Sequence, residues 1–177
     1  MMARATRRLL MLGLICASQL CGPAQAQPDD STADEKPESE LVLPAAPVKA
    51  NLLPFHVSPT ATLNFAIDAK SLSVTEDGIV RFTLVVTSTS GATNISHEGI
   101  RCSSFEKKLY ATGHADGSWV RSKRDVWSPI RDAGSNRQHA ALAKDYFCDA
   151  STVSGKADTI VDRIRRQKTL RYEALPK

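Results

Sequence analysis

Histidine is the commonest metal ligand in proteins, and this chain of 177 residues has four of them: His56, His97, His114 and His139. No two of these stand at the H-x-x-x-H spacing that places both imidazoles on one face of a helix. The pair His97-Glu98 lacks the second histidine of an H-E-x-x-H zinc motif. We therefore predict no metal site and no cofactor.

Hydrolysis is the second chemistry to weigh. The G-x-S-x-G motif of many serine hydrolases is absent, and Gly117-Ser118-Trp119 resembles it only superficially. Glycine-rich phosphate-binding loops are absent as well. A small hydrolase acting on a cell-envelope polymer would have to take its acid and base from Glu98, His97 or His139, provided that the fold brings them together. His139 also fits another interpretation, a buried core histidine on the apolar face of a helix.

Charged residues near two of the cysteines favour binding instead of catalysis. Glu98 and Arg101 precede Cys102, and Arg137 lies near the start of the segment that leads to Cys148. If the two cysteines are joined, these side chains form one patch in which arginine binds an anion in a bidentate manner. The anion would be a carboxylated glycan or an acidic protein segment. Alternatively, the charges pair with one another or face water.

The candidate ligand-binding residues are therefore Glu98, Arg101, Arg137 and His139. Two tryptophans lie near them in the sequence among basic residues: Trp119 and Trp127, with Arg121, Lys123, Arg124 and Arg131. Nucleic acid is a disfavoured partner, because the C-terminal basic run at 163–168 has no interleaved aromatic residue. The expected partner is an unidentified anionic ligand or an envelope protein.

The elements that must position these residues follow from hydrophobic periodicity. Residues 63–68 and 80–87 alternate apolar with other side chains, and 71–75, 93–102, 105–113 and 118–120 also favour strands. Short connections with Asp77-Gly78, Ser90-Gly91 and Asp116-Gly117 predict antiparallel turns. A helix from Ser135 or Asn136 has one apolar face, formed by His139, Leu142, Ala143 and Tyr146.

A second helix begins near Ser154 and has its own apolar face, formed by Ala157, Ile160, Val161 and Ile164. The sequence therefore predicts an α+β fold. It consists of an antiparallel meander sheet of about five strands with two C-terminal helices packed on one face.

The first 26 residues have the three parts of a secretory signal peptide. Three arginines precede the uncharged run 9–22, and Ala24-Gln25-Ala26 follows it as a cleavage site. The run is too short to span a bilayer, which takes roughly 20 apolar residues. We expect cleavage at Ala26-Gln27, a periplasmic or secreted product and no transmembrane anchor. A buried core helix and a lipoprotein anchor are the alternatives, but neither Cys16 nor Cys21 follows a small residue.

Cleavage would leave only two of the four cysteines, Cys102 and Cys148, in an oxidising compartment. We predict a disulfide between them. The alternatives are two buried free thiols or a redox-active pair, although redox pairs usually have the close C-x-x-C spacing that is missing here.

Residues 27–53 are acidic and rich in proline, and they contain no aromatic residue. This composition predicts a disordered linker before a globular domain at residues 54–177. Two other interpretations remain open. The apolar piece Leu41 to Leu43 docks on the domain or a partner, or the acidic segment folds over the basic domain and screens it until a competing partner arrives.

Four segments resemble the cryptic neisserial protein 1-like (CNP1-like) family of exported bacterial proteins. They are SLSVTEDGIVRFTLVVTS at 71–88, GATNISHEGIRC at 91–102, YATGHADGSW at 110–119 and NRQHAALAKDYFC at 136–148. The resemblance implies export and a single domain of that type. None of the segments is a catalytic signature, so the resemblance transfers no functional residue.

The function expected from the sequence is that of an exported periplasmic protein, a non-catalytic binding domain or an envelope-associated accessory domain. The alternative is the small envelope hydrolase described above.

Overall fold

The computed structural model describes residues 37–134 and 137–173. These residues belong to one compact unit that begins at Lys36. The expected signal peptide and residues 27–36 of the expected linker lie outside the described residues, as do the two expected helix caps at 135 and 136. None of the helices in the two described ranges combines the length and hydrophobicity that a bilayer crossing requires.

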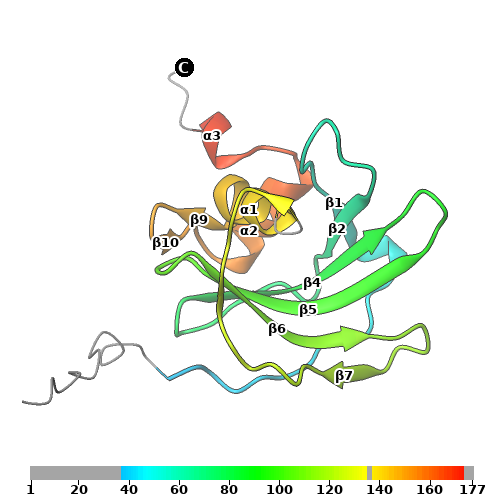
Figure 1. Ribbon diagram of the computed structural model, residues 1–177. Coiled ribbons are helices and arrows are strands. Elements are labelled where there is room, and N and C mark those ends of the chain that lie inside the picture. Colours follow the sequence, from blue (N-terminus) through cyan, green and yellow to red (C-terminus); the bar gives the residue numbers. More distant parts are fainter. Residues whose placement is uncertain (1–36, 135–136, 174–177) are drawn as a thin grey trace, which may run out of the picture. The chain divides into compact units, whose positions relative to one another are not determined.

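In the described part of the chain, eight strands form one antiparallel sheet. Its main order is β1-β2-β4-β5-β6-β7 (Figure 1), and in addition β3 pairs with β4 and β8 pairs with β6. The strands are β1 (Leu52–Pro54), β2 (Asn64–Asp68), β3 (Ser73–Val74), β4 (Ile79–Thr87), β5 (Thr93–Arg101), β6 (Glu106–Gly113), β7 (Trp119–Arg121) and β8 (Ser128–Pro129). The α+β class is confirmed, but the number of strands exceeds the expected five. Strands of two or three residues, such as β1 and β8, are too short for an alternating pattern to be recognised.

Strands β4 and β5 are the centre of the sheet and pair from Ile79↔Arg101 to Thr87↔Thr93. Successive side chains of a strand point to opposite faces. We call the face that carries Phe82 and Glu98 the inner face, and the face that carries Arg81 and His97 the outer face. The register with β6 shifts between His97 and Glu98, so that Tyr110 is an additional residue in β6.

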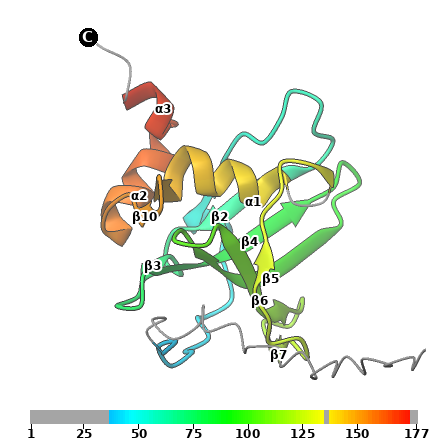
Figure 2. The same cartoon turned by 60° about the vertical axis from the view of Figure 1, so that its left-hand side comes forward.

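Helices cover part of the inner face (Figures 1 and 2). They are α1 (Arg137–Leu142), the π-helical turn η4 (Ala143–Phe147), α2 (Ala157–Arg165) and α3 (Leu170–Glu173), while a 3₁₀ turn, η2 (Lys49–Asn51), precedes the sheet. The predicted helix faces are confirmed, because their central residues are buried: His139, Leu142, Ala143, Tyr146, Ile160 and Ile164. All of them except His139 share one hydrophobic core with Val80, Phe82 and Ile100 of the sheet.

The end of η4 leaves backbone carbonyls that need donors, and Arg163 of α2 provides one. Its Nη1 donates to the Tyr146 carbonyl at 3.2 Å and to Ser154 Oγ at 3.0 Å. Ser154 Oγ itself donates to the Tyr146 carbonyl at 2.7 Å. The buried guanidinium thus fixes α2 against the turn that leads into the short hairpin of β9 (Cys148–Asp149) and β10 (Thr152–Val153).

The predicted disulfide is present. Cys102 and Cys148 are joined, with their Cα atoms 5.5 Å apart, and both are buried in the core. The bond connects the residue after β5 to β9, which follows η4 directly. It therefore holds the helical layer against the centre of the sheet.

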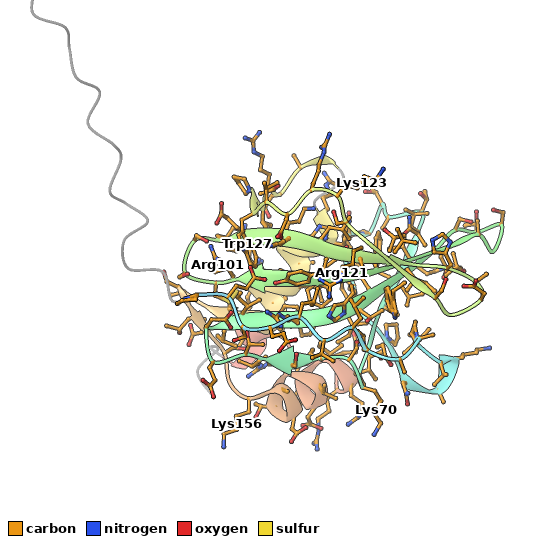
Figure 3. The ribbon with its side chains drawn as sticks, turned by 90° about the horizontal axis from the view of Figure 1, so that it is seen from below. Lys70, Arg101, Arg121, Lys123, Trp127 and Lys156 are labelled. Atoms are coloured by element: carbon orange, nitrogen blue, oxygen red, sulfur yellow. A yellow bond between two sulfur atoms is a disulfide. The ribbon has the colours of Figure 1, made fainter. Side chains whose placement is uncertain are left out.

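The structure places residues 37–48, which we call the strap, differently from the expected linker. The strap crosses the outer face of the sheet (Figures 1 and 3), and the indole Nε1 of Trp119 donates to the Pro44 carbonyl at 2.8 Å. The compact unit therefore begins at Lys36, earlier than the boundary at 54 that composition indicates. Composition does not predict this placement, because an acidic segment can either remain in solvent or bind a cationic surface. No local sequence pattern distinguishes the two.

We predict that replacing both Cys102 and Cys148 by alanine lowers the free energy of unfolding by about 4 kcal/mol. The two cysteines are 46 positions apart, and closing a loop of that length removes chain entropy from the unfolded state. Urea unfolding of the oxidised protein and the double variant measures the difference. Equal midpoints and slopes would show that the crosslink does not stabilise the fold.

Candidate functional site

A groove of about 850 Å³ opens on the inner face of the sheet, which we call the inner groove. Its floor is apolar and consists of Phe65, Leu84, Val86 and Leu109. Loop 57–63 and the turn between β4 and β5 form its rim. The helices leave this part of the inner face open, because the β4–β5 hairpin extends beyond them (Figure 1).

One end of the inner groove is polar and contains Ser96, Glu98 and Arg137. Glu98 is 7% exposed, and both of its carboxylate oxygens are used. Ser96 Oγ donates to Oε1 at 2.6 Å, and His139 Nε2 donates to Oε2 at 2.5 Å. Burial opposes ionisation of Glu98, but the bonds from His139 and Ser96 outweigh it and lower the pKa of Glu98 below its ordinary 4.5. Glu98 is therefore a buried carboxylate that ties α1 to β5.

The order of these three side chains is not that of a catalytic triad. In a triad the imidazole lies between the serine and the acid, so that it can take the serine proton. Here Glu98 lies between Ser96 and His139, and the serine hydroxyl donates to the carboxylate. His139 is 4% exposed and its Nδ1 has no hydrogen-bond partner in the described ranges. The trio positions the helix and does not generate a nucleophile.

His97 does not join Glu98 and His139, because adjacent residues of a strand face opposite sides of the sheet. On the outer face its Nδ1 lies 3.2 Å from Thr83 Oγ1. Its ring packs between Tyr110 and Trp119, with centroid distances of 6.0 Å to each. Burial, aided by the Arg81 charge, lowers the pKa of His97 to about 4. It is a neutral aromatic spacer at pH 7.

The remaining histidines are dispersed, since His56 and His114 are exposed in separate loops. Among the residues that the structure describes, no three His, Cys, Asp or Glu side chains are grouped so that they would hold a metal ion.

The structure does not assemble the charged patch that we expected from Glu98, Arg101 and Arg137. Arg101 is three residues from Glu98 and lies on the outer face, where its guanidinium stacks 4.1 Å from the centroid of Trp127 (Figure 3). It also pairs with Glu106 at 3.8 Å. Glu98, His139 and Arg137 remain together on the inner face, the first two in direct contact and Arg137 at the groove.

The sequence analysis missed the floor of the inner groove. Leu84 and Val86 continue the alternation of Val80 and Phe82, so nothing distinguishes a groove residue from a core residue. The only local signal is the rim, where the polar loop 57–63 follows buried Phe55. Which strand ends the helices leave uncovered depends on helix length and docking angle, neither of which a residue pattern specifies.

A comparison with known families finds one match: the model of the CNP1-like family matches residues 31–165. That range contains the strap, the whole sheet, the inner groove and the disulfide. No curated protein and no solved structure matches the chain.

We predict that Glu98→Gln lowers the free energy of unfolding at pH 7 by about 3 kcal/mol, because it removes the charged acceptor of two buried hydrogen bonds, from His139 and from Ser96. The pKa of Glu98 is lower in the folded state than its ordinary 4.5, so its contribution to stability is complete above that pH. The contribution is lost as the pH falls through the folded-state pKa. Chemical unfolding between pH 7 and pH 3 should show this acid loss in the wild type and a flatter profile in Glu98→Gln.

The control is Glu40→Gln, which neutralises the same side chain type at an exposed position. It should retain the wild-type profile. A Glu98→Gln profile parallel to that of the wild type would refute the role of this carboxylate.

Proposed function

The chain belongs to the CNP1-like family, and on that premise we propose that it is an exported, non-catalytic binding domain. Its ligand would be a small amphipathic anion held in the inner groove. The observation that carries the proposal is the groove itself, an apolar trough of about 850 Å³ that ends at an arginine.

The size and lining of the groove support a ligand of this class. Binding pockets for small molecules usually measure about 300 to 1,000 Å³ and combine an apolar wall with a few polar groups. Leu109, on the floor, remains 36% exposed. Covering this side chain with an apolar ligand removes hydrocarbon surface from water, worth about 25 cal/mol per Å².

The charge at the polar end supports an anion. Arg137 is exposed, and no hydrogen bond or ion pair engages its guanidinium among the described residues. Glu98 lines the same groove, but among the described residues no ion pair joins it to Arg137, and its carboxylate is bonded to Ser96 and His139. An arginine in this state binds a carboxylate or phosphate in a bidentate manner.

Export is supported by residues 1–26, which have a basic start, an apolar run and an Ala-Gln-Ala cleavage site. The disulfide supports it as well, because such bonds persist mainly in oxidising compartments. The periplasm is the compartment that accounts for both.

We predict that dodecanoate, below its micelle concentration, raises the melting temperature of the protein by several degrees. A ligand at one hundred times its Kd adds about 2.7 kcal/mol to the native state. Arg137→Gln should weaken binding about tenfold, the equivalent of about 1.4 kcal/mol. Leu109→Ser should weaken it through the apolar body of the ligand, without touching the charged group.

The matched control is Arg131→Gln, since Arg131 is also exposed but does not line the groove. Dodecyltrimethylammonium, with the same chain and the opposite charge, serves as the control ligand. Equal shifts with both ligands, or an unchanged affinity in Arg137→Gln, would exclude the proposed anion site.

A further inference from the structure

The strap runs over the outer face of the sheet (Figure 3), and several polar contacts hold it there. Arg81 of β4 is the central one, and its side chain is only 5% exposed. Its Nη1 donates to the Glu40 carbonyl at 2.8 Å and its Nη2 to the Ser39 carbonyl at 2.5 Å. Nη2 also lies 3.6 Å from the Glu38 carboxylate. All three of these Arg81 contacts end on the strap.

Glu38 is shared with a second cation. Lys108 Nζ donates to Glu38 Oε2 at 2.9 Å and also contacts the exposed carboxylate of Asp125. Burial opposes the charge on Lys108, but its bonds to Asp125 and Glu38 raise the pKa of Lys108 above its ordinary 10.5. One carboxylate of the strap therefore lies between two buried cations that come from different strands, β4 and β6.

The surface beneath these cations is aromatic and is shaped by a glycine. The Tyr110 ring lies 5.3 Å from the Arg81 guanidinium and 5.6 Å from Lys108 Nζ. It lies against Gly99, where an added Cβ atom would be 2.7 Å from the tyrosine hydroxyl oxygen. Trp119 extends the surface to the far end of the strap, where its indole binds Pro44. Cations over aromatic rings form a preorganised site for a carboxylate.

The site recognises features that many peptides share. Three of the strap atoms that accept hydrogen bonds from the site are backbone carbonyl oxygens, those of Ser39, Glu40 and Pro44. A fourth backbone contact is the Ser39 amide, which donates to Asp77 Oδ2 at 2.8 Å. The one charged side chain that it recognises in the strap is Glu38. An extended segment with one glutamate at the right place satisfies all of these groups.

The strap is held less firmly than a strand of the sheet. Among the described residues it has no ladder pairing with a strand, and none of its side chains is fully buried. Val42 is 77% exposed and Val48 is 54% exposed, whereas Leu41 and Leu43 are half-buried. Its attachment therefore depends on a few polar contacts, which are individually modest in free energy and weakened by salt.

We propose that the outer face is a recognition site for an extended acidic segment of a partner protein, and that residues 37–44 of the strap occupy this site in cis as a built-in competitor. This site and the inner groove lie on opposite faces of the sheet. The proposal therefore does not depend on the ligand proposed for the inner groove. A tethered segment acts at an effective concentration in the millimolar range, so a partner is bound only to the extent that the strap opens.

The test uses the full chain and a fluorescent peptide with the sequence of residues 37–48. In the chain, Glu38→Gln removes the shared carboxylate and opens the site, so the peptide should bind this variant at least tenfold more tightly than the wild type. Glu40→Gln is the matched control, because Glu40 lies in the same strap and is bound only through its carbonyl. Fluorescence anisotropy measures the affinities, and Glu40→Gln should match the wild type.

Strap opening has its own readout. The chain has two tryptophans, and the Trp119 indole N–H is bonded to the strap. Its ¹⁵N–¹H resonance should move in Glu38→Gln and return when the peptide is added. Asp77→Ala removes the acceptor of the Ser39 amide but keeps the Glu38 carboxylate, so it should loosen the strap less and give a smaller shift in the same direction.

Three results would overturn the proposal. The first is no peptide binding to either opened variant at millimolar concentration. The second is equal binding of a peptide in which the glutamate equivalent to Glu38 is replaced by glutamine. The third is a dimer by sedimentation in the opened variants, which would assign the site to the strap of a second copy.

Discussion

Strands β4 and β5 are buried on both faces, and the polar side chains at their centres must therefore find partners inside the domain. Seven consecutive residues of β4 are buried, among them Arg81 and Thr83. On β5 the buried stretch includes Ser96, His97 and Glu98. An unpaired charge in such a position is strongly destabilising. The helices on one face and the strap on the other provide the partners that these buried polar side chains need.

The two faces meet it in different ways. On the inner face, Glu98 is paired with His139 of α1, in a layer that the Cys102–Cys148 bond holds in place. On the outer face, Arg81 is paired with the strap, a segment with no covalent crosslink and no ladder in the described residues. The inner pair is therefore part of a fixed scaffold, whereas the outer pair depends on a segment that a competitor can replace.

These differences give the domain two surfaces with separate chemistry. The inner groove combines an apolar floor with the guanidinium of Arg137, which has no partner among the described residues, and this combination suits a small amphipathic anion. The outer face presents two cations over aromatic rings, which suits an extended acidic chain. The sheet separates the two sites, because the adjacent residues His97 and Glu98 of β5 point to the outer and the inner face, respectively.

Local patterns in the sequence determined the α+β class, the longer strands, the buried faces of both C-terminal helices and the cysteine pair. The strands and helix faces depend on the spacing of apolar residues along the chain, and the cysteine pair depends on the number of cysteines. Both can be read from the sequence without knowledge of the fold. Only the tertiary structure decided that Glu98 meets His139, that Arg101 turns away from it, and that Glu38 reaches Arg81 and Lys108. Those partners lie far apart in the chain, 41 residues for Glu98 and His139 and 70 for Glu38 and Lys108. Their meeting depends on strand order, on the bulge at His97 and Glu98 and on the path of the strap, none of which is encoded in local periodicity.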